Sequence, residues 1–245
     1  MSAERSLAPL GIKRLLGIHY YVRDLERSRR FYVDLMDFAE VAESSPQLMQ
    51  AGKQRSLVFE AGQIRIVCST PVGQGGRAWR YLQKHPDGVG TIAFEVEDIA
   101  HAFRLLDERG GTLIEEIGHA HDEYGSVASF SITTPFGDTT FRFFEYRNYA
   151  GLFPGMIKHP KPRGGKNQFQ LQAFDHVTSN FQTMKPALLW LEHVLGFEPF
   201  WEIAFHTEDR NHTLNQGSGQ HGSGLRSQVM WDPVSGCKFA NNEPF

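Results

Sequence analysis

Short apolar runs separated by polar turns fill the first part of the chain and predict strands around one amphipathic helix. Residues 17–22 form such a run, and Asp24 then caps a predicted helix that places Leu25, Ser28, Phe31, Tyr32 and Leu35 on one face. Two further runs, residues 56–60 and 63–68, flank Ala61-Gly62 as the strands of a hairpin flank their turn. The predicted order of elements is β-α-β-β-β.

The same order returns twice. A second unit has an apolar run at residues 90–96, a helix over about 99–109 ended by Gly110-Gly111, and three strand-like runs that finish at residues 139–146. A third unit begins at residues 174–177 and continues with a helix over about 186–194. A unit of this size cannot bury its own sheet face, so the units are expected to pair. The predicted fold class is α+β, with repeated βαβββ units, curled mixed sheets and helices outside.

The region between the second and third units interrupts this pattern. Residues 151–168 are dense in proline, glycine and positive charge, which predicts a solvated linker between an N-terminal domain (1–150) and a further segment (169–245). The basic residues have no interleaved aromatic residues and no helix, so a connector is favoured over a phosphate or nucleic-acid patch. The third unit has no fourth unit to pair with, and we expect its sheet to keep an open edge and an uncovered apolar face.

Composition narrows the class of protein further. The 245 residues are 40% hydrophobic, include 19 phenylalanines and carry a net charge of −3, which suits one or two apolar cores and gives no case for nucleic acid. No apolar run approaches the roughly 20 residues that cross a bilayer, and the N-terminus lacks a signal-peptide pattern, so the expected location is cytoplasmic. Cys68 and Cys237 lack metal-binding spacing and are interpreted as reduced, structural residues.

Histidines were considered as metal ligands in each unit. Aligning the units by their helices makes His19, Ile92 and His176 equivalent first-strand positions, with Glu145 on the last strand of the second unit. An open metal site needs at least three protein ligands, and isoleucine has no lone pair. The first two units are therefore expected to hold no transition metal, and His19 is interpreted as a pocket or core histidine.

Five other histidines are weaker candidates. His119 and His121 share a face of a strand-like turn without a third partner, which is typical of a surface strand. His206, His212 and His221 flank a segment rich in glycine, serine and asparagine over residues 211–224, a composition typical of a loop and here interpreted as a mobile one.

Three short motifs in the last unit, taken in order, resemble the catalytic half of the 4-hydroxyphenylpyruvate dioxygenase family. They are Phe-Asp-His-Val (174–177), Gly-Leu-Arg-Ser (224–227) and Lys-Phe-Ala-Asn-Asn-Glu-Pro (238–244). Phe-Phe-Glu-Tyr-Arg-Asn-Tyr (143–149) before the linker supports the same resemblance, and the repeated unit resembles the vicinal oxygen chelate superfamily over nearly the whole chain.

The resemblance implies an Fe(II) enzyme whose metal is held by two histidines and one carboxylate. His176 matches the first histidine, Ser227 and Asn242 match positions that line the substrate pocket, and the remaining two ligands would lie beyond Phe245. The implied partners are an aromatic 2-oxo acid and O2. The implied reaction converts 4-hydroxyphenylpyruvate to homogentisate in tyrosine catabolism, and the 245 residues by themselves are expected to be inactive.

Three alternatives remain open from the sequence. A related branch of the family makes 4-hydroxymandelate, and the residues that distinguish the two branches would also lie beyond Phe245. A noncatalytic protein that encloses a small aromatic ligand in its first domain is a second alternative, and a simple fragment of a longer protein is a third. The sequence leaves the oligomeric state open, and a homo-oligomer is compatible with it.

Overall fold

The structure is a computed structural model that describes residues 7–206 and 224–244. The first unit comprises β1 (Ile12–Tyr21), α1 (Leu25–Arg29), η1 (Arg30–Leu35), β2 (Ala39–Ser44), α2 (Pro46–Gly52), β3 (Gln54–Ala61) and β4 (Ile64–Pro71). The second comprises α3 (Arg77–Lys84), β5 (Gly88–Val96), α4 (Ile99–Glu108), β6 (Gly118–Asp122), β7 (Gly125–Ile132) and β8 (Thr140–Arg147). After β9 (Met156–Gly164), the third comprises β10 (Val177–Asn180), α5 (Lys185–Trp190), η2 (Leu191–Leu195), β11 (Glu198–His206), β12 (Gly224–Trp231) and β13 (Lys238–Pro244).

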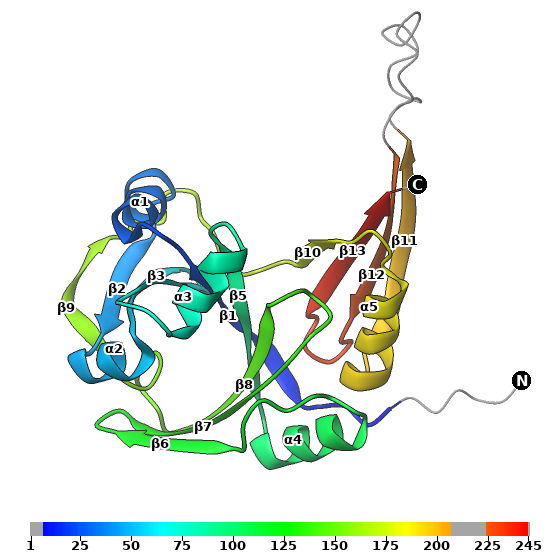
Figure 1. Cartoon of the computed structure of the whole chain (residues 1–245), viewed down its shortest axis with the longest axis horizontal. Helices are drawn as coiled ribbons and strands as arrows, with labels where there is room; N and C mark the ends of the chain where they lie inside the picture. The colour runs from blue at the N-terminus through cyan, green and yellow to red at the C-terminus, as the bar shows by residue number, and fades with distance from the viewer. Residues whose placement is uncertain (1–6, 207–223, 245) are drawn as a thin grey trace, which may run out of the picture.

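The first two units share one curled sheet (Figure 1). Its nine strands follow the order β6-β7-β8-β5-β1-β4-β3-β2-β9, and the two units meet where β1 and β5 pair antiparallel. The third unit forms a separate sheet in the order β10-β13-β12-β11. The predicted fold class, with repeated βαβββ units and an unpaired last unit, is confirmed.

The helices begin and end where local chemistry requires. The Asp24 side chain accepts a hydrogen bond from the Arg27 N–H at 2.9 Å and caps α1 as predicted, and Gly196 ends η2 in the left-handed region at φ 76°. The predicted apolar face of the first helix was partly wrong, since Phe31 and Leu35 are exposed. The helix widens into the π-helical turn η1 at Arg30–Leu35, which changes the period from that of an α-helix.

The segment expected to be a linker contains a strand. Met156–Gly164 form β9, which pairs antiparallel with β2 at the edge of the large sheet. Pro160 and Pro162 fall at an irregularity in this pairing, between Lys158 opposite Ala42 and Arg163 opposite Glu40. Proline is tolerated at an edge strand and at a bulge, so its density did not exclude a strand here.

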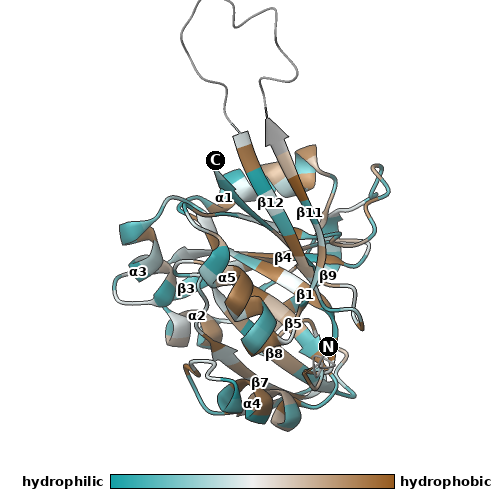
Figure 2. Cartoon of the chain, turned by 90° about the vertical axis from the view of Figure 1, so that its right-hand side faces the viewer, coloured by the Kyte–Doolittle hydropathy of each residue, from teal (hydrophilic) through white to brown (hydrophobic). Residues whose placement is uncertain are grey.

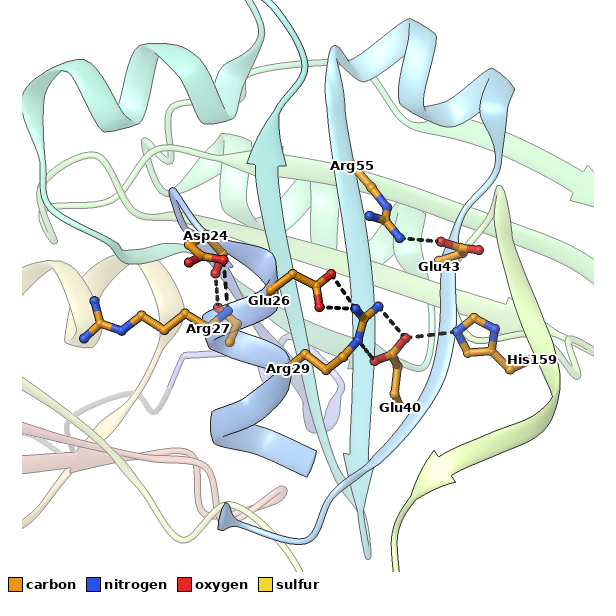
Figure 3. A network of polar contacts seen from close by, with 9 residues as sticks. Asp24, Glu26, Arg27, Arg29, Glu40, Glu43, Arg55 and His159 are labelled. Atoms are coloured by element: carbon orange, nitrogen blue, oxygen red, sulfur yellow. Dashed lines mark hydrogen bonds and ion pairs between the residues drawn. The ribbon is translucent and has the colours of Figure 1, made fainter. Parts of the chain in front are cut away.

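Ion pairs secure the same edge (Figure 3). The Arg29 guanidinium donates to the Glu40 carboxylate at 2.5 Å from Nε, and this pair joins α1 to β2. Only 13% of the Arg29 side chain and 6% of the Glu40 side chain are exposed. On the other side of Glu40, His159 Nε2 of β9 lies 3.5 Å from Oε1. Glu40 therefore connects three elements, namely α1, its own strand β2 and the edge strand β9.

The main core joins the second and third units. Phe94, Phe141 and Phe143 of the large sheet lie in one buried cluster with Leu191 of η2 and Phe239 of β13. The Phe141 and Phe239 ring centroids are 5.5 Å apart. One face of the third sheet is thus covered by its own helix and by the second unit.

The opposite face of the third sheet is open (Figure 1). Phe200, Trp201 and Leu225 are 44%, 46% and 38% exposed on β11 and β12. Figure 2, which faces this unit, shows hydrophobic and hydrophilic segments mixed on α5 and β12. This agrees with the expectation that an apolar face would be left uncovered.

Both cysteines are buried and unpaired, as predicted, and burial raises the pKa of the Cys68 thiol to about 12. Within residues 7–206 and 224–244, no helix is long and apolar enough to span a membrane.

Candidate functional site

The concave side of the large sheet encloses a cavity of about 500 Å³. Alternate residues of β1, β5 and β8 face it, including His19, Thr91 and Arg142. The segment leading into β9 closes one side with Phe153, Pro154 and Met156. The cavity is therefore shared by both units and by the region that the sequence treated as a linker.

Two arginines line this cavity. Arg77, the first residue of α3, donates from Nη2 to Thr140 Oγ1 at 2.7 Å and to the Gly90 carbonyl at 3.0 Å. Arg142 of β8 donates from Nη2 to Ser129 Oγ at 3.0 Å, and its guanidinium lies 5.0 Å from the centroid of the Phe144 ring. Both residues were missed by the sequence analysis, because α3 was not predicted and Arg142 sits within an apolar-looking strand.

His19 is held neutral at the floor of the cavity. Its Nε2 lies 2.6 Å from Ser69 Oγ, which in turn lies 2.5 Å from Ser56 Oγ. Burial, followed by the charges of Arg77 and Arg142, lowers the pKa of the His19 imidazole to about 3. The interpretation of His19 as a pocket histidine agrees with this position.

Ile92 and Glu145, the residues that the repeat alignment placed with His19, face away from the cavity. Ile92 is 3% exposed in the core under α4, and Thr91 is the residue paired with His19 across β1 and β5. The alignment that made Ile92 equivalent to His19 was therefore wrong, because strand side chains alternate between faces. Glu145 also points to the helix side, where Oε2 accepts a hydrogen bond from the Ile99 N–H at 2.9 Å.

Strand register shows which residues share the open face of the third sheet. Phe239 and Glu243 face the helix side, since Phe239 is buried in the core and Glu243 Oε2 accepts from the Met184 N–H at 2.7 Å. Asn242 therefore faces the open side. Ser227 is opposite Asn242 in the β12–β13 register and lies on the same face.

His176 directly precedes β10 at the other end of this sheet. Its Nδ1 lies 2.6 Å from Asp175 Oδ2, and the second carboxylate oxygen of Asp175 accepts from Lys238 Nζ at 3.1 Å. Asp175 thus orients the ring and leaves Nε2 without a partner among the residues that the structure describes, which is the arrangement that metal-ligating histidines show. His176 and Lys238 line a separate hollow of about 310 Å³ together with Lys13 and Arg14 of β1.

The structure does not bring the three predicted site residues into one hollow. Asn242 donates from Nδ2 to Asn180 Oδ1 at 3.0 Å, so it lies at the opposite end of β10 from His176. Positions 176 and 180 are four residues apart, and four steps along a strand span about 13 Å. Ser227 is 5% exposed, and Arg226 beside it forms an ion pair with Glu243 on the helix side.

A complete metal site is not formed by the residues that the structure describes. Among them, no group of three His, Cys, Asp or Glu side chains lies close enough to hold an ion. His119 of β6 lines the large cavity, and His121 Nδ1 lies 3.1 Å from Ser126 Oγ. The side chain of His206, together with His212 and His221, lies outside the described residues.

The sequence of the first two units matches a family model. The model of the Glyoxalase/Bleomycin resistance protein/Dioxygenase superfamily matches residues 12–139, and the chain belongs to this superfamily. The match runs from β1 through β7 of the two units that share the large sheet and ends just before β8.

Curated relatives extend the similarity into the third unit. The 4-hydroxyphenylpyruvate dioxygenase of Dictyostelium discoideum is 27% identical over 236 residues, which cover 93% of this chain and 61% of the relative. The enzyme of the same name from Yarrowia lipolytica is 28% identical and also covers 93% of this chain, with 57% of the relative. The chain therefore spans less than two thirds of the length of these relatives.

Solved structures show the same fold. A triple mutant of 4-hydroxymandelate synthase from Streptomyces coelicolor superposes with a TM-score of 0.74 at 18% identity, over 96% of this chain and 63% of that chain. A xylose isomerase-like TIM barrel/4-hydroxyphenylpyruvate dioxygenase fusion protein gives a TM-score of 0.68 at 12% identity, over 98% and 34%.

Proposed function

We propose that this chain carries part of an Fe(II)-dependent dioxygenase that acts on an aromatic 2-oxo acid, with 4-hydroxyphenylpyruvate as substrate and homogentisate as product. The observation that carries the proposal is the placement of the third unit's motifs. Ser227 and Asn242 share the open face of its sheet, and His176, directly before β10, has an Nε2 without a partner among the described residues. The similarity to enzymes named 4-hydroxyphenylpyruvate dioxygenase extends over this unit and supports the proposal.

The residues described here do not complete an iron site. His176 offers one imidazole, whereas a mononuclear site that leaves positions open for substrate and O2 needs two histidines and a carboxylate. When bound, Fe(II) would supply O2 activation, and the further ligands are proposed to come from a fourth βαβββ unit facing the open side of the third sheet.

The open face offers a suitable surface for such a unit. Phe200, Trp201 and Leu225 are exposed there, and burying them against a second sheet would remove apolar area from water. The hydroxyl of Ser227 and the amide of Asn242 are proposed to orient the organic part of the substrate in the space between the two sheets.

The reaction product tests this proposal and separates it from the related synthase. A polypeptide that carries residues 1–245 followed by a fourth unit is incubated with Fe(II), O2 and 4-hydroxyphenylpyruvate, and the products are separated by liquid chromatography. Homogentisate supports the proposal. Formation of 4-hydroxymandelate would assign the protein to the other branch, and the absence of both products would contradict a dioxygenase that uses this acid.

A further inference from the structure

We propose that the cavity of the large sheet is a second binding site, independent of the proposed iron site, for a small aromatic carboxylic acid whose carboxylate lies between Arg77 and Arg142.

The wall of the cavity carries positive charge. Arg77 and Arg142 line the cavity, and within the described part of the chain neither forms an ion pair with a carboxylate. Arginines elsewhere in this structure, such as Arg29, Arg65 and Arg226, are paired with glutamates. Two unpaired guanidinium groups in one cavity create a positive potential that favours an anion.

The nearby acidic residues do not neutralise these arginines. Glu115 influences the pKa of Arg142 but accepts a hydrogen bond from Ser131 Oγ at 3.2 Å, and it does not line the cavity. Glu95 lies further along β5 and is held by Lys13 and Arg14. The neutral His19 imidazole adds no positive charge and supplies a polar group at the floor.

Both guanidinium groups keep donors that are available to a ligand. Arg77 donates only from Nη2, to Thr140 and to the Gly90 carbonyl, within the described part of the chain. Arg142 likewise donates only from Nη2, to Ser129. These contacts hold each guanidinium in place, and its other N–H groups have no hydrogen-bond partner among the described residues. A planar fork of this kind suits a carboxylate.

Much of the remaining cavity wall consists of apolar side chains. The apolar residues that line the cavity include Val67, Ala93, Val127, Phe144, Phe153 and Met156. A cavity of about 500 Å³ with a few convergent polar groups has the size and lining of a small-molecule site. An aromatic ring between these side chains and a carboxylate at the arginines would use both features.

The test is calorimetric titration of the 245-residue chain with 4-hydroxyphenylacetate and with its neutral amide, 4-hydroxyphenylacetamide. We expect the acid to bind, and the amide to bind at least about ten-fold more weakly because it cannot pair with the arginines (a ten-fold change is about 1.4 kcal/mol). Equal affinity of the two compounds, or no binding of the acid up to about 1 mM, a limit of about 4 kcal/mol, would overturn the proposal.

Variants locate the site. Arg142→Gln should weaken binding of the acid at least about ten-fold, and Arg142→Lys, which keeps the charge, should restore part of it. Arg104→Gln, on the outer surface of α4 where Arg104 pairs with Glu108, is the matched control and should bind as the parent does. Unchanged affinity in a folded Arg142→Gln variant would contradict the site.

Two further readouts keep this proposal separate from the iron chemistry. His176→Ala should leave binding of the acid unchanged, because His176 lines a different hollow. The ring signals of His19 should shift in NMR spectra on addition of the acid, since Arg77 and Arg142 lie within electrostatic reach of it. Loss of binding in His176→Ala, or unmoved His19 signals, would place the acid elsewhere.

Discussion

Glu145 accepts a hydrogen bond from the backbone N–H of Ile99 at 2.9 Å, so the last strand of the second unit holds the first residue of that unit's helix. The third unit repeats this contact, since Glu243 accepts from Met184 at 2.7 Å. A glutamate on the last strand of a βαβββ unit therefore has a structural role in both units, on the helix side of the sheet. The contact with Arg147 lowers the pKa of Glu145 and keeps it ionised.

Replacing Glu145 tests this role. Glu145→Ala should lower the free energy of unfolding by about 1–2 kcal/mol, because the helix loses a capping carboxylate. Chemical denaturation followed by circular dichroism measures the change. Binding of the aromatic acid should be unaffected, since Glu145 does not line the cavity. A variant as stable as the parent would show that the cap contributes nothing.

The ion pair between Arg29 and Glu40 should contribute more than the pairs at the surface. Glu40→Gln removes the more buried of the two carboxylates that pair with Arg29 and leaves only the exposed Glu26, so it should cost about 1.5–3 kcal/mol. The matched control is Glu108→Gln in the exposed pair with Arg104, which should change stability by no more than about 0.5 kcal/mol. Similar losses in the two variants would contradict the difference in burial.

The pH dependence of stability should depend on His19. Its pKa is about 3 in the folded chain against an ordinary value near 6.5, so the unfolded chain binds a proton between these values and the folded chain does not. The contribution of the neutral His19 to the free energy of unfolding is fully present above pH 6.5 and is lost as the pH falls toward 3. Between pH 7 and pH 5 the loss from this group is about 2 kcal/mol.

His19→Gln removes that titration. Denaturation curves at pH 7 and pH 5 should show a smaller loss of stability in the variant than in the parent. An identical loss in both would mean that the His19 pKa is not lowered in the folded chain.

Ser227 and Asn242 should act on the organic substrate. In a polypeptide that includes a fourth unit, Ser227→Ala and Asn242→Ala should each raise the substrate KM by about ten-fold, the value of one hydrogen bond. Iron content, measured by a chelator assay, should stay at the level of the parent. A loss of iron with unchanged KM would place these residues at the metal instead.

Much of the fold could be predicted from the sequence, because helix caps, turn residues and apolar runs mark the elements of each repeated unit. Asp24 and Gly196 fix the limits of two helices through capping and a left-handed backbone. β9 was missed, because prolines obscure an edge strand whose pairing depends on the distant β2. Ile92 was misplaced, since its side chain lies in the core while its neighbours Thr91 and Ala93 line the cavity, and a shift of one position moves a strand residue to the other face.

Only part of the site could be predicted, because local sequence patterns do not show which distant residues meet in the fold. Motifs in the third unit pointed to His176, Ser227 and Asn242, and strand alternation places Ser227 and Asn242 on one face of the sheet. Arg77 and Arg142 come from different elements, and only the curvature of the sheet brings them into one cavity. Their lack of carboxylate partners among the described residues is a property of three-dimensional contacts that no local pattern records.

Oxygen uptake with 4-hydroxyphenylpyruvate and added Fe(II) tests the proposed function most directly. The 245-residue chain alone should show no uptake, because one imidazole holds iron too weakly to form an open three-ligand site. A polypeptide with a fourth unit should consume oxygen and lose this activity in His176→Ala, while His193→Ala, an exposed histidine of η2, should leave it intact. Robust uptake by the 245 residues alone, or full activity of the extended His176→Ala variant, would contradict the account.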